Sequence, residues 1–276
     1  MSYQVVNLRP LHSGGNGDLY IGQRSDSGEH VVVKYLREYG SIHARKAFMR
    51  EVRILGRKLH GWIPLLFANT GAERPFYVMP YLNGGALTKH AGRLTDSHLQ
   101  TIATELAGTL ANLHAMNDVD GDFKPDNVLV TQDGRVQVAD PLGTGTVFTM
   151  LFSENRGGTP GYWAPEIRGG GSISRAGDVY SFGATFYELL TGRRPSDGQR
   201  LDPTSEGYRR APKICEIIAA CCQTQPQSRP TMQEVLRMLH GEKWSDIQIV
   251  RKQRQEFAAA ACAVGGLVLL GAALSA

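Results

Sequence analysis

The stretch that decides the fold is Asp120-Gly121-Asp122-Phe123-Lys124-Pro125-Asp126-Asn127. Lys124 and Asn127 stand two and five residues after Asp122, so a carboxylate, an ammonium and an amide share one short loop. Apolar runs follow, and the second, residues 136–139, leads to Asp140. A strand-turn-strand hairpin built from these runs would hold both carboxylates, the amide and the ammonium within a few ångströms of one another.

Phosphoryl transfer from Mg·ATP uses this set of groups. It requires a carboxylate that orients a hydroxyl and accepts its proton, a cation beside the moving phosphoryl group, and oxygen ligands for the metal. The stretch resembles the catalytic loop of protein kinases, H-R-D-L-K-P-x-N, with the Asp of D-F-G following. The resemblance implies Asp122 and Lys124 as catalytic residues and Asn127 and Asp140 as ligands of Mg²⁺. A surface hairpin rich in turn residues is the alternative for this stretch taken alone.

Apolar segments at residues 4–11, 19–22 and 31–34 open the chain and predict the strands of an antiparallel meander. The glycines of the first turn, Gly14 and Gly17, would therefore join one strand to the next. A dinucleotide-binding fold requires its glycines to lead from a strand into a helix, so this pattern argues against that fold.

The same turn resembles the glycine-rich loop that covers the phosphates of ATP in kinases. Gly14 and Gly17 match the second and third glycines of that loop, while His12 stands in place of the first. The resemblance implies backbone contact with phosphate at these two glycines, and it implies Leu11 and Leu19 as apolar walls of the nucleotide site.

Lys34 ends a Val-rich strand as the Lys of V-A-I-K does, with Val32 in place of the Ala that faces the adenine. Residues 44–59 carry their apolar side chains on one stripe, which predicts a helix. Glu51 lies on this helix at the interval expected of the Glu that pairs with the kinase lysine. The resemblance therefore implies an ion pair that aims Lys34 at the α- and β-phosphates of ATP.

Residues 76–85 resemble the last strand of the small kinase lobe and the hinge after it. Met79 would be the gatekeeper beside the adenine. Pro80 has no N–H to donate, but the adenine requires only a carbonyl at that position, and Leu82 would supply the N–H. Leu129, just after the catalytic loop, is the remaining apolar residue that the resemblance assigns to the nucleotide site.

The second half of the chain carries further blocks in the order of the kinase family. Residues 94–114 have the pattern of one long amphipathic helix that leads to the catalytic loop. Residues 157–166 closely resemble the G-T-x-x-Y-x-A-P-E block that ends kinase activation segments, and residues 178–192 resemble the central helix of the large lobe. Arg229 stands where the family has the late Arg that pairs with the Glu of this block, here Glu166.

The resemblance covers roughly residues 4–240 and implies an α+β, bilobal protein kinase fold. Residues 1–82 would form the N-lobe, a small antiparallel sheet with one helix, and residues 83–240 the larger helical C-lobe. The implied activity is that of a eukaryotic-like Ser/Thr protein kinase, which transfers the γ-phosphoryl group of ATP to hydroxyls of protein substrates. Lys124, two residues after the catalytic Asp, is the Ser/Thr-class pattern, and Thr159 would face the substrate.

Some positions depart from the family pattern. Asp120 replaces the His that donates a structural hydrogen bond beneath the D-F-G turn, and Pro141 replaces the Phe of that turn. Gly121 replaces the Arg that receives an activation-loop phosphate. We therefore expect constitutive activity, or regulation by association, rather than dependence on phosphorylation. The activation-loop hydroxyls concerned are those of Thr144, Thr146, Thr149 and Ser153.

Charge and cysteine content exclude other classes of protein. The chain of 276 residues has a formal net charge of +4, which is too small and too scattered to indicate a nucleic-acid partner. The four cysteines form no C-x-x-C pair. Cys215, Cys221 and Cys222 fall in an apolar helical pattern, so we expect buried, reduced thiols. The N-terminus has no apolar stretch of the kind found in signal peptides.

Residues 257–276 carry no charge, and as a helix they would extend about 30 Å, the thickness of the hydrocarbon core of a bilayer. A buried soluble helix is the alternative, but the kinase resemblance is complete near residue 240. We expect a single-pass transmembrane helix after a basic juxtamembrane linker at residues 241–256. The basic flank at residues 251–254 predicts that the kinase domain is cytoplasmic. The small residues Ala261 and Gly265, spaced by four, would let two such helices associate as a homodimer.

Two other functions fit parts of the pattern. A pseudokinase would use the same fold as a membrane-tethered, nucleotide-binding scaffold without catalysis, although every polar group named for the chemistry is present. A small-molecule kinase of the aminoglycoside phosphotransferase type shares the core of the fold. That class lacks the A-P-E block and the late Arg, so Ala164-Pro165-Glu166 and Arg229 argue against it.

Overall fold

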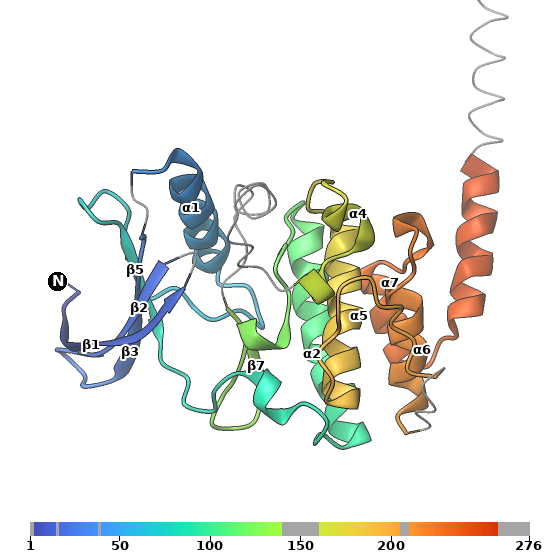
Figure 1. Ribbon diagram of the computed structural model, residues 1–276, viewed down its shortest axis with the longest axis horizontal. Coiled ribbons are helices and arrows are strands. Elements are labelled where there is room, and N and C mark those ends of the chain that lie inside the picture. Colours follow the sequence, from blue (N-terminus) through green and yellow to red (C-terminus); the bar gives the residue numbers. More distant parts are fainter. Residues whose placement is uncertain (1–2, 15–16, 38–39, 140–159, 205–209, 259–276) are drawn as a thin grey trace, which may run out of the picture.

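The computed structural model describes residues 3–14, 17–37, 40–139, 160–204 and 210–258. Figure 1 shows a sheet and one helix at one end of the molecule and a larger group of helices at the other. This division into a small sheet-containing lobe and a large helical lobe confirms the predicted bilobal α+β kinase architecture.

The small lobe is built on a five-stranded antiparallel sheet in the order β1-β2-β3-β5-β4. The first three strands form the predicted meander, and the β1–β2 hairpin closes where Gly14 pairs with Gly17. The strands are β1 (Val5–Gly14), β2 (Gly17–Arg24), β3 (His30–Tyr35), β4 (Phe67–Asn69) and β5 (Phe76–Pro80).

Strand β3 is buried on both faces, which explains its run of valines. Successive side chains of a strand point to opposite faces, and Val31 and Val33 pack on Val78 in a small cluster on one side of the sheet. Val32 points the other way and belongs to the main core. Lys34 shares the face of Val32, so the strand directs its lysine toward the large lobe.

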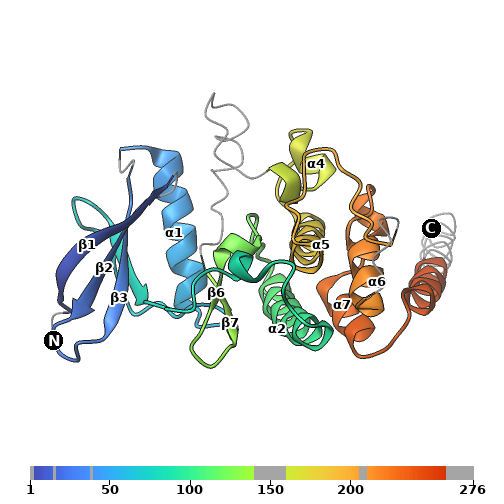
Figure 2. The ribbon, with the colours of Figure 1, turned by 60° about the horizontal axis from the view of Figure 1, so that its bottom comes forward.

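Helix α1 (Ile42–Gly56) lies on the side of the sheet that faces the large lobe (Figure 2). Ser41 caps its N-terminus by accepting a hydrogen bond from the Ala44 N–H at 3.3 Å. The sequence pattern predicts this helix at residues 44–59. The observed helix ends three residues earlier because Lys58 has a φ of 51°, which a right-handed helix cannot contain.

The large lobe is organised around helix α5, whose residues 177–190 are all buried. Helices α2 and α6 pack against α5, and α7 packs against α2. Of the three thiols predicted to be buried, Cys215 and Cys221 on α6 are buried and free, whereas Cys222, directly after the helix, is free but only half-buried. The helices are α2 (Asp96–Ala115), α4 (Pro165–Arg168), α5 (Arg175–Thr191), α6 (Pro212–Cys221) and α7 (Met232–Leu239), and the 3₁₀ turns are η1 (Leu87–His90), η2 (Pro125–Asn127), η3 (Pro160–Tyr162) and η4 (Pro226–Ser228).

The predicted hairpin after the catalytic loop consists of β6 (Val128–Val130) and β7 (Val136–Val138). It also joins the lobes through the main chain. The Val138 N–H donates to the carbonyl of Gly61 at 2.8 Å, and the Val138 carbonyl accepts from the Ile63 N–H at 2.9 Å. The segment that follows α1 is thereby fixed to the strand that leads to Asp140.

A further helix covers residues 244–258, within and just beyond the segment for which the sequence predicts a basic linker. Ile247 is fully buried in the main core, and Arg251 pairs with Glu234 on α7. Within the described part of the chain, no helix has both the length and the apolar surface needed to cross a bilayer. Residues 259–276, which hold most of the predicted span, lie outside the described residues, and so do Ala261 and Gly265.

Candidate active site

The catalytic loop brings the predicted Asp122, Lys124 and Asn127 together at the start of the hairpin. The Lys124 ammonium lies 2.7 Å from Oδ2 of Asp122. The Asn127 side-chain amide donates to the same oxygen at 3.1 Å and to the Asp122 carbonyl at 2.9 Å. Asp122 is 9% exposed, and these donors fix its carboxylate.

The local sequence explains why the loop takes this shape. Pro125 opens the 3₁₀ turn η2, where its missing N–H and fixed φ are favourable. The turn ends at Asn127, and strand β6 begins at once. Because the Ala139 N–H donates to the Asn127 carbonyl at 2.8 Å, the chain leaving β7 returns beside Asn127. Asp140, the second predicted metal ligand, is the next residue, but it lies outside the described residues together with Pro141 and Thr159.

Asp178, at the N-terminal end of α5, holds the catalytic loop from below. Its carboxylate accepts hydrogen bonds from the backbone N–H groups of Asp120 and Gly121, each at 2.8 Å, and contacts Nε2 of His114 at 2.8 Å. Gly121 has a φ of 84°, a conformation that glycine adopts most readily. The sequence did not predict this role of Asp178, because its partners in the loop are backbone N–H groups.

Asp120, in the position where the kinase family has His, is almost fully buried at 1% exposure. Its Oδ1 accepts a hydrogen bond from the Asp122 N–H at 2.9 Å. Burial raises the pKa of the Asp120 carboxyl well above its usual value, and the nearby Asp178 charge raises this pKa further. Asp120 therefore supports the catalytic loop as a buried hydrogen-bond acceptor for the backbone of Asp122.

In the small lobe, Lys34 and Glu51 form the predicted ion pair, with the Lys34 ammonium 2.9 Å from Oε2 of Glu51. Both side chains are buried, at 3% and 2% exposure. Tyr77, opposite Lys34 in the sheet, donates its hydroxyl to the same carboxylate at 3.3 Å. A Cβ at Gly17 would lie 2.7 Å from the Tyr35 carbonyl and 3.2 Å from the Lys34 side chain, so only glycine fits above the lysine.

The apolar residues predicted to hold the adenine come largely from one cluster. Val32 and Met79 are buried members of the main core, and Leu19, Leu82 and Leu129 pack against it half-buried. These residues come from β2, β3, β5, the hinge and β6, so the cluster joins the lobes. The other three residues predicted to contact ATP lie at strand ends or on the surface. Pro80 ends β5, Gly14 ends β1, and Leu11 on β1 is 46% exposed.

Arg229 and Glu166 form the predicted structural pair. The two guanidinium nitrogens of Arg229 lie 2.7 and 2.8 Å from the two carboxylate oxygens of Glu166. The Arg229 guanidinium also donates to the carbonyls of Gln223, Thr224 and Ala176. Burial alone would raise the pKa of the Glu166 carboxyl, but the hydrogen bonds from Arg229 lower this pKa below its usual value. The pair ties the end of the activation segment to the rim of the large lobe.

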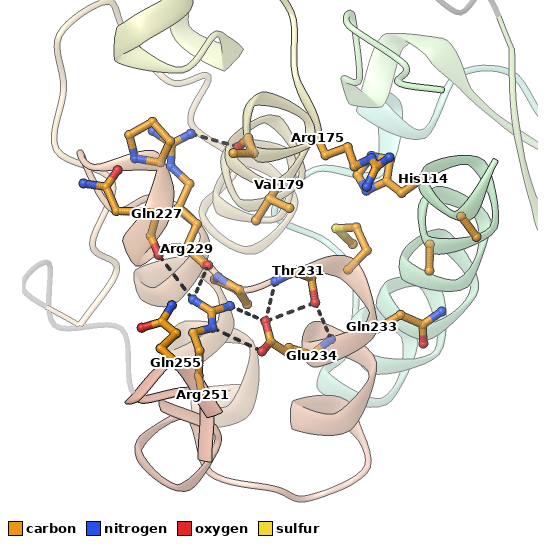
Figure 3. Close-up of a pocket in the computed structure, with 16 residues that line it drawn as sticks. His114, Arg175, Val179, Gln227, Arg229, Thr231, Gln233, Glu234, Arg251 and Gln255 are labelled. Atoms are coloured by element: carbon orange, nitrogen blue, oxygen red, sulfur yellow. Dashed lines mark hydrogen bonds and ion pairs between the residues drawn. The ribbon is translucent and has the colours of Figure 1, made fainter. Parts of the chain in front are cut away.

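A separate cavity of about 600 Å³ lies among α2, α5, η4, α7 and the 244–258 helix (Figure 3). Arg251 reaches into it and binds Glu234 and the carbonyls of Gln227 and Arg229. His114 on the opposite wall is bound to Asp178. Because Arg251 and His114 are both bound to groups of the same chain, we interpret the cavity as the place where the 244–258 helix docks rather than as a second catalytic site.

The lobes and the two charged clusters between them define the protein kinase class. The model of the protein kinase domain matches residues 5–240, and the chain belongs to this family, among the eukaryotic-like Ser/Thr kinases.

Bacterial and plant kinases are among the similar proteins. The DNA damage-responsive serine/threonine-protein kinase RqkA of Deinococcus radiodurans is 32% identical over 71% of this chain and 30% of its own length. The probable serine/threonine-protein kinase PkwA of Thermomonospora curvata is 33% identical, over 88% and 34%. The LRR receptor kinase SERK2 of rice, Oryza sativa subsp. japonica, is 28% identical, over 89% and 48%. The chain thus spans about a third to a half of the length of these relatives.

Proposed function

We propose that this chain is an ATP- and Mg²⁺-dependent kinase that transfers the γ-phosphoryl group of ATP to Ser and Thr hydroxyls of protein substrates. The observation that carries the proposal is the cluster in which Lys124 and Asn127 both bind Oδ2 of Asp122. A carboxylate held in this way can orient a hydroxyl for attack and accept its proton as the new bond forms.

The remaining residues act on the nucleotide. Lys34, aimed by Glu51, binds the α- and β-phosphates, and Lys124 stabilises the negative charge of the phosphoryl group during transfer. Gly14 and Gly17 bring the β1–β2 hairpin close to the phosphates. Each charge is already in place before the reaction, which is the arrangement that lowers a barrier most effectively.

The donor set fits Mg²⁺. Because Asn127 turns its amide N–H groups toward Asp122, its side-chain oxygen is left for a cation, and Mg²⁺ prefers oxygen ligands. Asn127 and Asp140 would hold the metal, which when bound neutralises charge on the β- and γ-phosphates.

The scaffold alternative predicts nucleotide binding without transfer. The Lys34–Glu51 pair would serve nucleotide binding in either case, so the Asp122–Lys124–Asn127 cluster is the observation that favours catalysis over this alternative. The Glu166–Arg229 pair favours a protein kinase over the aminoglycoside phosphotransferase type, which lacks both residues.

Transfer of labelled γ-phosphate to casein and to the chain itself tests the proposal. We expect Lys34→Met and Asp140→Asn to reduce the rate by about a hundredfold or more, on the scale of losing one preorganised charge. Lys46→Met is the matched control, since Lys46 is exposed on α1. An Asp140→Asn variant that keeps its rate within about threefold would exclude the assigned roles.

We also propose that residues 257–276 anchor the chain as a single-pass membrane helix, with the kinase domain cytoplasmic and with homodimers forming through the span. Support comes from the uncharged sequence and its basic flank. Washing membranes with alkaline carbonate tests the anchor. Retention of the full-length chain in the pellet is expected, and its release into the supernatant would mean that the segment does not span the bilayer.

A further inference from the structure

Asp118, four residues before the catalytic Asp122, is surrounded by two arginines of α1 and by Arg57, the C-cap residue directly after the helix. Its Oδ1 lies 3.0 Å from Arg53 and 3.5 Å from Arg50, and its Oδ2 lies 2.7 Å from Arg57. Asp118 itself is only 8% exposed. Arg50, Arg53 and the C-cap Arg57 are spaced by three and four residues, and Arg57 keeps helical dihedrals, so the three side chains share one face of the helix. The Asp118 carboxylate of the large lobe thus binds the arginine face of α1 in the small lobe.

Arg50 extends this contact to the catalytic loop itself. Its guanidinium donates to the carbonyl of Val119, and Arg50 is 7% exposed. Burial lowers the pKa of Arg50, while the charges of Asp118, Asp120 and Asp178 act in the opposite direction. Arg50 is therefore a buried cation of α1 that interacts electrostatically with three acidic residues at the catalytic loop and contacts one of them, Asp118.

The position of α1 matters because Glu51 is the next residue after Arg50. Adjacent residues on a helix point about 100° apart, so α1 presents Arg50 to the catalytic loop and Glu51 to Lys34. A rotation or outward movement of the helix that broke the Asp118 contacts would also withdraw Glu51 from Lys34. The Arg–Asp118 cluster and the Lys34–Glu51 pair are therefore held by two faces of the same helix.

We propose that Asp118, with Arg50, Arg53 and Arg57, is the positioning group that fixes α1 against the catalytic loop and so keeps Lys34 aimed at ATP. The proposal rests on the kinase function proposed above. A single carboxylate attracts three guanidinium groups that would otherwise repel one another. Because Asp118 and Arg50 are buried, the exclusion of water strengthens their mutual attraction most. These contacts are made by side chains of the folded domain, so they require no phosphorylation.

Kinetics of two variants test the proposal, each with its own control. Asp118→Asn removes the charge and keeps the shape, while Arg53→Gln/Arg57→Gln leaves buried Arg50 in place and is the safer variant for folding. We expect each to lower kcat/KM for ATP by about 3- to 30-fold. The matched control for the pair is Arg45→Gln/Lys46→Gln, which removes two charges from exposed positions of the same helix. We expect Asp118→Glu to recover most of the activity.

Combination with Glu51→Gln separates positioning from a general structural role. If Asp118 acts through Glu51, Asp118→Asn adds less than about twofold to the loss already caused by Glu51→Gln. A double variant whose loss is the product of the two single losses would overturn the proposal. So would variants at Asp118, Arg53 and Arg57 that retain the activity of their controls.

Hydrogen exchange tests the same proposal without catalysis, so that it does not fail merely because the kinase function fails. In Asp118→Asn the amides of α1 should exchange at least about tenfold faster than in the exposed-charge control, while those of α5 keep their rate. Unchanged exchange in α1 would contradict a positioning role. If the wild type transfers no phosphate while Asp118→Asn still shows faster exchange in α1, only the kinase function is contradicted.

Discussion

At the scale of single residues, Asp120 and Asp178 share the space beneath the catalytic loop, and both carboxylates bind backbone N–H groups. Two acids in one buried space repel each other, which is one reason for the raised pKa of Asp120. Arg50 supplies the compensating cation from the other lobe. The loop therefore differs chemically from one that carries His and Arg at positions 120 and 121, while Asp122 is still held in place.

The raised pKa of Asp120 predicts a pH-dependent stability. The folded protein retains a proton that the unfolded chain releases, so stability is greatest below the unfolded pKa of about 4 and falls as the pH rises through the folded-state pKa. Asp120→Asn keeps the acceptor oxygen without the charge. We expect the free energy of unfolding of Asp120→Asn to rise relative to that of wild type as the pH rises across this window, by at most about 1.4 kcal/mol per pH unit.

Urea unfolding of the two proteins from pH 5 to pH 8 measures this difference. Asp133→Asn, in the exposed turn between β6 and β7, is the control and should show no such trend. An Asp120→Asn protein that becomes less stable relative to wild type as the pH rises would mean that the buried carboxyl is ionised at little cost.

The sequence was sufficient to predict the site residues whose partners lie in the same short loop or at a spacing typical of the kinase family. Asp122, Lys124 and Asn127 meet because they share one turn, and Lys34 and Glu51 meet because β3 and α1 are adjacent elements. It did not reveal Asp178 or Asp118. The partners of Asp178 are backbone N–H groups, which have no sequence signature, and those of Asp118 lie some sixty residues away on a helix whose orientation depends on the whole fold.

At the scale of elements, the pair Arg229–Glu166 joins the short helix α4 to the η4–α7 segment. Arg229 has a side chain with 0% exposure, and Glu166 is 27% exposed at its side chain. Arg229→Met would leave the Glu166 carboxylate and three backbone carbonyls without their donor. We expect a loss of about 3 kcal/mol in the free energy of unfolding, at the lower end for a buried pair because Glu166 retains some solvent.

Arg237→Met is the matched control for this prediction. Arg237 pairs with Glu242 on the surface, where both side chains are well exposed, so its removal should change the stability by about 0.5 kcal/mol or less. Equal urea midpoints for Arg229→Met and Arg237→Met would show that the buried pair does not stabilise the large lobe.

Element boundaries depended on capping that the apolar pattern does not contain. The pattern places the long helix of the large lobe at residues 94–114, whereas α2 begins at Asp96 because Thr95 accepts a hydrogen bond from the His98 N–H. The helix at residues 244–258 was predicted as a linker, since its charged residues hide the buried Ile247. Its docking uses Ile247, Trp244 and Arg251, and such a small set of contacts gives no clear apolar periodicity.

At the scale of the whole molecule, the absence of an arginine at position 121 predicts independence from activation-loop phosphorylation. The contacts that fix α1 to the large lobe come from Asp118 and three arginines, and none of them requires a phosphate. We expect a variant with alanine at Thr144, Thr146, Thr149 and Ser153, which lie outside the described residues, to phosphorylate casein within about threefold of the wild-type rate. A silent variant would show that the inference from Gly121 is wrong.

The central claim is that the cluster of Asp122, Lys124 and Asn127 transfers phosphate as well as binding nucleotide. A single-turnover experiment with labelled ATP, in which bound ATP and transferred phosphate are measured in the same sample, tests it most directly. We expect wild type to transfer the label to protein hydroxyls, and Asp122→Asn to bind ATP with similar affinity but transfer it about a thousandfold more slowly. Wild type that binds ATP and transfers no label, or an Asp122→Asn variant that transfers at the wild-type rate, would contradict the claim.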